Sequence, residues 1–114
     1  MTIVMRKRSD LERILDKNEI KHDRKVSNIS EQLRGYGYDI DTHIEYYNNV
    51  TNKVVGEVDI LAKDKYGYMN VEVKCNGRGM VKGYEQLRRF KHYFPNLNVV
   101  NSLFINKNGV YRVD

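Results

Sequence analysis

The chain has 114 residues, of which 40% are hydrophobic and 31% charged, with a formal net charge of +5 and an isoelectric point near 9.3. This balance excludes a disordered chain and fits one soluble domain, residues 1–114, with a modest core. The excess of Lys and Arg indicates an anionic partner. With no apolar run of about 20 residues, no signal-peptide pattern and one cysteine, we expect a cytoplasmic protein with no membrane contact.

The N-terminal third predicts a helical segment over about residues 9–34, either one broken helix or two. Residues 9–12, Ser-Asp-Leu-Glu, match the capping-box pattern that begins many helices. Val26, Ile29 and Leu33 then recur at helical spacing and end at a Gly-Tyr-Gly stop signal.

The rest of the chain predicts strands and one further helix. Alternation and strand-forming residues predict strands over 38–47, 54–63, 68–75, 99–105 and 110–113, and an apolar stripe predicts a helix over 80–94. The helix that links the third and fourth of these strands allows the two to pair in parallel. The expected fold is α/β, with a mixed central β-sheet flanked by helices.

Polar side chains share one face of two neighbouring predicted strands. Because side chains alternate along a strand, Asp59 lies on the face of Glu57 and Leu61, and Glu72 lies on the face of Asn70 and Lys74. The opposite face is apolar and consists of Val58, Ile60 and Ala62 with Met69, Val71, Val73 and Cys75. A hairpin closing near residue 65 would bring the two carboxylates together.

Two neighbouring carboxylates repel each other unless a cation lies between them. Hard oxygen ligands favour Mg²⁺, with Mn²⁺ as a substitute, and such an ion can generate a hydroxide nucleophile. Lys74, on the same face as Glu72, can stabilise charge on a phosphodiester. A Glu-x-Lys triplet is also common by chance, and Glu72 and Lys74 alone fit a solvated ion pair. The Asp in the adjacent strand and the apolar residues around both polar sets favour a site.

The segments Gly56–Ala62 (GEVDILA) and Val71–Lys74 (VEVK), thirteen residues apart from Asp to Glu, resemble the PD-(D/E)xK nuclease superfamily. The similarity extends over about residues 30–104 and is greatest to archaeal Holliday junction resolvases. It implies a restriction-endonuclease-like core in which Asp59, Glu72 and the main-chain carbonyl of Val73 bind the metal and Lys74 is catalytic. Val58 occupies the position of the proline that gives the superfamily its name, and many members lack that proline.

The same resolvases usually have a metal-site glutamate on the first helix, and here Val26 falls at the aligned position. Counting back by heptads from Leu33 through Val26 leads to Glu19, which we take as the candidate, with Asp23 in reserve. A solvated helix charge is the alternative for both. On the second helix, Gln86 resembles a glutamine that faces the active site in related nucleases, although a solvated role is equally compatible with its position.

Basic residues follow the predicted site closely in the sequence. Arg78, Lys82, Arg88 and Arg89 are candidates for DNA-backbone contacts, and the alternative is a solvated helix face. Aromatic residues Tyr46, Tyr47 and Phe94 are candidates for a dimer interface.

The leading hypothesis is a Mg²⁺-dependent endodeoxyribonuclease that, by resemblance, resolves four-way DNA junctions as a homodimer. A second hypothesis is a nuclease that cuts single strands, flaps or ends in phage or mobile-element DNA. A third, from another class, is a nucleic-acid-binding module without catalytic activity.

Overall fold

The computed structural model describes residues 2–9 and 16–113. Along the chain the elements are β1 (Ile3–Lys7), α1 (Lys17–Gly35), β2 (Asp39–Asn48), β3 (Val54–Asp64), β4 (Gly67–Val73), α2 (Met80–Tyr93), β5 (Val99–Asn106) and β6 (Gly109–Arg112). Within the described ranges the strands form one six-stranded sheet in the order β1-β2-β3-β4-β5-β6.

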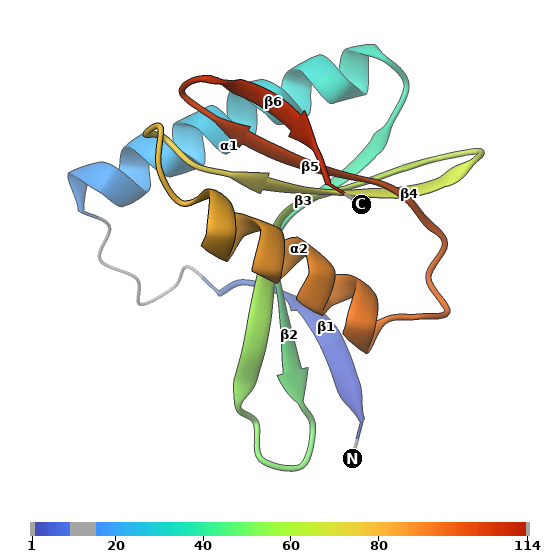
Figure 1. The fold of residues 1–114 in the computed structure, drawn as a ribbon. Helices are drawn as coiled ribbons and strands as arrows, with labels where there is room; N and C mark the ends of the chain where they lie inside the picture. The colour runs from blue at the N-terminus through green and yellow to red at the C-terminus, as the bar shows by residue number, and fades with distance from the viewer. Residues whose placement is uncertain (1, 10–15, 114) are drawn as a thin grey trace.

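The sheet is mixed, as the sequence predicts. β4 and β5, which α2 connects, pair in parallel, and every other neighbouring pair is antiparallel. The two helices lie on opposite sides of the sheet (Figure 1), so the expected α/β architecture with flanking helices is confirmed. No helix in residues 2–9 and 16–113 is long and apolar enough to cross a membrane.

The N-terminal region differs from the prediction. β1 was not predicted; it pairs with β2 from Ile3↔Asn48 to Lys7↔Ile44 and forms an edge of the sheet. α1 is a single helix that begins at Lys17, where Asp16 accepts from the Glu19 N–H at 2.8 Å in a capping box. Ser9 is not helical, and the rest of the predicted capping box at 10–12 lies outside the described residues.

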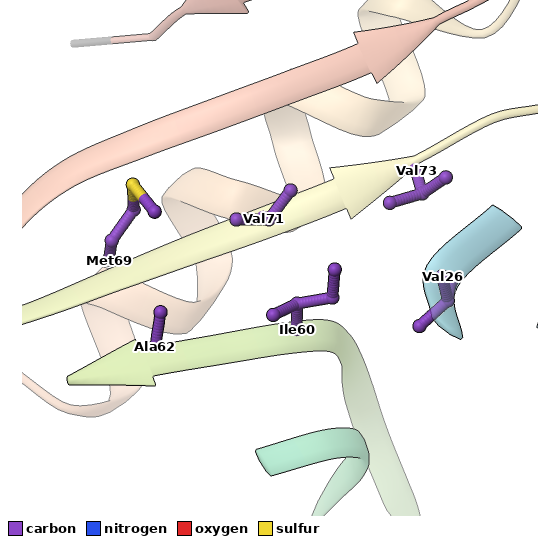
Figure 2. Close-up of a cluster of buried hydrophobic side chains, with 6 residues drawn as sticks. All are labelled: Val26, Ile60, Ala62, Met69, Val71 and Val73. Atoms are coloured by element: carbon purple, nitrogen blue, oxygen red, sulfur yellow. The ribbon is translucent and has the colours of Figure 1, made fainter. Parts of the chain in front are cut away.

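One core cluster lies between α1 and the sheet (Figure 2). Val26 from α1 packs against Ile60 and Ala62 from β3 and against Met69, Val71 and Val73 from β4, all at most 5% exposed. Burial of these side chains stabilises the docking of α1, since each fully buried apolar side chain contributes roughly 1.5–3 kcal/mol. This docking fixes the position of the α1 residues one turn before Val26.

A second cluster lies on the α2 side of the sheet. It consists of Ile44, Tyr46, Val58, Leu61 and Phe90. The prediction that Val58 shares a face with Ile60 and Ala62 is therefore wrong, because β3 bends between them. The prediction that Tyr46 lies on a dimer surface is also wrong, because Tyr46 is fully buried against Phe90, Tyr93 and Phe94.

The sheet forks at Asp59. β3 pairs with β4 from Ile60↔Val71 to Asp64↔Gly67, whereas its pairing with β2 continues back to Val54. The first half of β3 therefore runs with β1 and β2, away from β4–β6 (Figure 1). On β2, His43 lies opposite Asp59 and has φ +52°, a left-handed backbone conformation that is uncommon for residues other than glycine. Beyond the fork, Glu72 and Val73 at the end of β4 have no partner residue in the β3 register, although both stay buried.

Candidate active site

Asp59 and Glu72 meet at the fork in the sheet. Continuing the β3–β4 register by one pair beyond Ile60↔Val71 places them opposite each other. The Asp59 Oδ2 atom accepts a hydrogen bond of 2.8 Å from the Val73 N–H, and the two residues are 8% and 4% exposed. The structure thus brings together the two carboxylates that strand alternation predicted to be neighbours.

The environment of Glu72 disfavours its ionised form. Burial, followed by the charge of Asp59, raises the pKa of the Glu72 carboxyl to about 8, and the nearby Lys74 ammonium opposes the rise. Lys74 Nζ lies 3.5 Å from Glu72 Oε1. The Lys74 ammonium therefore does not offset the cost of ionising Glu72, and a bound cation would reduce that cost.

Lys74 follows the last residue of β4 and is held from two sides. Its N–H donates to the Ile105 carbonyl at 2.8 Å, and its own carbonyl accepts from Lys25 Nζ at 2.7 Å. Its aliphatic stem passes over Gly79, the N-cap of α2, where a Cβ would lie 3.4–3.5 Å from the Lys74 Cγ, Cδ and Cε atoms. The glycine, at φ +83°, lets the helix start beside the lysine.

Gln86 on α2 faces the same carboxylate. With its amide nitrogen turned toward β4, it donates to Glu72 Oε2 at 2.9 Å and to Oε1 at 3.0 Å. It lies one turn before Phe90, whose burial anchors this stretch of α2. The predicted position of Gln86 beside the site therefore agrees with the structure, although its role in catalysis stays a prediction.

The α1 residue that reaches the carboxylates is His22, which the sequence analysis did not select. Its Nε2 atom donates to the main-chain carbonyl of Val73 at 2.9 Å and lies 3.3 Å from Asp59 Oδ2. The hydrogen bond to Asp59 raises the pKa of the His22 imidazole to about 9, against the lowering caused by burial. His22 precedes the buried Val26 by four residues, so the helical period was a signal that could have identified it.

The two α1 candidates chosen from the sequence have hydrogen-bond partners other than Asp59 and Glu72. The Glu19 carboxylate accepts from the Asp16 N–H at 3.2 Å in the capping box, so it serves the start of α1. The Asp23 carboxylate accepts from Arg8 Nη2 at 3.1 Å. Although burial opposes it, this bond to Arg8 keeps the pKa of Asp23 below its usual value. Counting back seven residues from Val26 leads to Glu19. Counting back four residues, which also keeps to one face of a helix, leads to His22 instead.

The candidate DNA contacts are all exposed. Arg78 lies in the turn before α2, and Lys82, Arg88 and Arg89 lie on α2 itself. The Arg88 guanidinium lies 5.9 Å from the centre of the Tyr84 ring. These four side chains are exposed to an anionic ligand, and three of them, Lys82, Arg88 and Arg89, share α2 with Gln86.

The donors at the fork suit a hard divalent cation that keeps several waters. Asp59, Glu72 and the Val73 carbonyl offer oxygen atoms, and Mg²⁺ is commonly bound by one or two carboxylates with water completing the shell. In the described part of the chain, no group of three or more His, Cys, Asp or Glu side chains is arranged to hold a metal ion.

No protein-family model matches the chain, and no curated protein is significantly similar to it.

Proposed function

We propose that the chain is a metal-dependent endodeoxyribonuclease that hydrolyses DNA phosphodiesters at Asp59, Glu72 and Lys74. The observation that most supports this is the buried pair of carboxylates, Glu72 with a pKa raised to about 8 beside Asp59, with the Lys74 ammonium 3.5 Å from Glu72. Perturbed titratable groups gathered at one point are typical of functional sites. A solvated surface ion pair would not be buried to this degree.

The residues at the fork divide the work of hydrolysis between them. Asp59, Glu72 and the Val73 carbonyl would hold Mg²⁺ or Mn²⁺. When bound, the ion supplies charge neutralisation and a water of lowered pKa. Lys74, whose stem is held over Gly79, directs an ammonium to the charge that grows on the phosphate oxygens. Gln86 holds the Glu72 carboxylate in one orientation.

DNA is the proposed substrate because exposed cations follow the site in the chain and lie on the helix that supplies Gln86 or in the turn before it. Arg78 is separated from Lys74 by three residues, and Lys82, Arg88 and Arg89 share α2 with Gln86. Cations arranged in this way bind the phosphate backbone without reading bases. The mixed sheet with one helix on each face is compatible with a restriction-endonuclease-like core, which we include in the proposal.

The resemblance to Holliday junction resolvases extends the proposal to branched DNA and to a homodimer that cuts two strands. A subunit of 13.5 kDa is small relative to a four-way junction, which favours a pair of subunits. Tyr47 and Phe94, both half-buried, remain candidates for the interface.

The test is cleavage of labelled four-way junction, flap, duplex and single-stranded DNA in Mg²⁺, Mn²⁺ or EDTA. We expect metal-dependent cuts that are fastest on the junction and that Asp59→Asn abolishes. Asp39→Asn, which changes an exposed carboxylate at the start of β2, is the matched control and should leave cleavage unchanged.

The substrate panel also separates the alternatives. Preferential cutting of flaps, ends or single strands would replace junction resolution with the second nuclease hypothesis. DNA binding without cleavage in either metal would contradict the nuclease proposal and favour a binding module. In an enzyme, Glu72→Gln abolishes cleavage and retains DNA binding.

A further inference from the structure

Three atoms from three different elements converge beside the carboxylate pair. His22 Nε2 on α1 lies 2.9 Å from the Val73 carbonyl oxygen on β4 and 3.3 Å from Asp59 Oδ2 on β3. Two adjacent ligands of an octahedral ion with bonds of about 2.1 Å lie about 3.0 Å apart. The imidazole nitrogen therefore lies close enough to both oxygens for the three atoms to bind one metal ion.

The other side of the imidazole faces a carboxylate. His22 Nδ1 lies 3.6 Å from Asp23 Oδ1, a buried oxygen that has no hydrogen-bond partner within the described ranges. The second oxygen of Asp23 is held by Arg8 at 3.1 Å. Metal-binding histidines commonly direct their free ring N–H to a carboxylate, which orients the ring and makes it more basic. Asp23 is placed to do this for His22.

We propose that His22 is a metal ligand through Nε2, that Asp23 orients it through Nδ1, and that this nitrogen ligand makes the site prefer Mn²⁺ to Mg²⁺. The inference rests on the metal site of the proposed function and specifies the ion that the site selects. Imidazole nitrogen suits transition ions, whereas Mg²⁺ favours oxygen donors and water. Binding replaces the Nε2 proton by the ion, and that proton passes to solvent.

The test uses Mn²⁺ as a paramagnetic probe of the intact chain, without any assay of cleavage. Three-pulse electron spin-echo envelope modulation of the Mn²⁺ complex should contain the signature of a directly bound imidazole ¹⁴N. Growth with ¹⁵N-histidine should convert that signature to ¹⁵N, which identifies the ligand as histidine without any substitution. His22→Gln should remove it and weaken Mn²⁺ binding by at least 10-fold, with a smaller loss for Mg²⁺.

Two histidines serve as matched controls. His43→Gln removes the second imidazole near Asp23, since His43 Nε2 lies 3.6 Å from Asp23 Oδ1. His92→Gln removes an exposed imidazole on α2. Both variants should retain the nitrogen signature. Asp23→Asn should keep the signature and weaken Mn²⁺ binding about 10-fold, as loss of such an orienting carboxylate does elsewhere.

Each other outcome has a definite meaning. Mn²⁺ bound without a nitrogen signature would overturn the assignment of His22 and leave the nuclease proposal standing, because Asp59 and Glu72 would then hold the ion alone. A signature that survives His22→Gln and disappears in His43→Gln would transfer the role to His43 and overturn the proposal. Failure of the wild-type chain to bind Mn²⁺ or Mg²⁺ at all would overturn both proposals.

Discussion

Gln86 on α2 donates to both carboxylate oxygens of Glu72 on β4, at 2.9 and 3.0 Å. A buried carboxylate with a raised pKa is thereby attached to the helix that also presents the exposed arginines. These hydrogen bonds link the position of α2 to the charge of Glu72. Substitutions of Glu72 and of Gln86 can each test the link.

Removing the Glu72 charge should flatten the pH dependence of stability in EDTA. The folded state keeps the Glu72 proton up to a pKa of about 8, whereas the unfolded chain releases it near 4.5, so stability falls as pH rises through this window. At pH 9, Glu72→Gln should raise the free energy of unfolding above that of the wild type by on the order of 2–4 kcal/mol. Thermal denaturation from pH 4 to 10 measures it.

A second group contributes to the same curve and must be separated from Glu72. The pKa of His22 is raised from 6.5 to about 9, so its stabilisation is complete below pH 6.5 and is lost as pH rises through 9. Glu72→Gln should therefore retain a residual loss between pH 6.5 and 9. Glu85→Gln, an exposed carboxylate on α2, is the control, and an unchanged slope in Glu72→Gln would contradict the assignment.

Gln86→Leu should lower the cleavage rate about 10-fold while DNA affinity changes little, because the Gln86 amide donates to both Glu72 oxygens and so orients that carboxylate. Gln86→Glu should be worse, since it adds a third negative charge to the site. Single-turnover cleavage and a separate binding titration give the two quantities. Gln32→Leu on the exposed face of α1 is the control, and a loss confined to DNA affinity would show that Gln86 is a DNA contact instead.

Gly56→Ala should destabilise the chain by about 1–3 kcal/mol through overpacking. A Cβ at Gly56 would overlap the hydroxyl end of the Tyr46 ring, which is fully buried and packs against Phe90 and Phe94. Urea denaturation measures the change. Gly35→Ala, where a Cβ would meet nothing within 4 Å, is the control and should not be destabilising.

A buried polar network next to Glu72 gives a double-mutant cycle. Ser102 Oγ donates to Asn70 Oδ1 at 2.5 Å, and Asn70 Nδ2 donates to the Leu87 carbonyl at 3.3 Å, which ties β5 and β4 to α2. Each alanine substitution should cost about 1–3 kcal/mol because it leaves a buried partner unsatisfied. The double variant should cost less than the sum by about 1 kcal/mol. Strict additivity, measured by urea denaturation, would contradict the coupling.

Much of the fold and the central part of the site were predictable from local patterns. Alternation and strand-forming residues identified β2 to β6, and the period of two placed Asp59 and Glu72 on adjoining strands with Lys74 two residues beyond Glu72. These relations depend on residues at most fifteen positions apart and joined by one hairpin, so strand geometry alone decides them.

The remainder depended on contacts between distant segments. β1 is a strand because it pairs with β2, about 40 residues away. Ile3–Lys7 has no alternating pattern from which a strand could be predicted. The burial of Tyr46 results from the bend of the sheet at His43 and Asp59, which removes the simple two-face pattern.

Local strand geometry was enough to identify the acidic pair and the lysine, because a strand dictates the direction of each side chain. Which α1 residue joins them depends on how the helix packs in three dimensions. His22 and Asp59 are 37 positions apart, and their contact depends on how Val26 seats the helix against β3 and β4. The helix packs there because apolar surface is buried. Residues that bury one another can be any number of positions apart in the sequence.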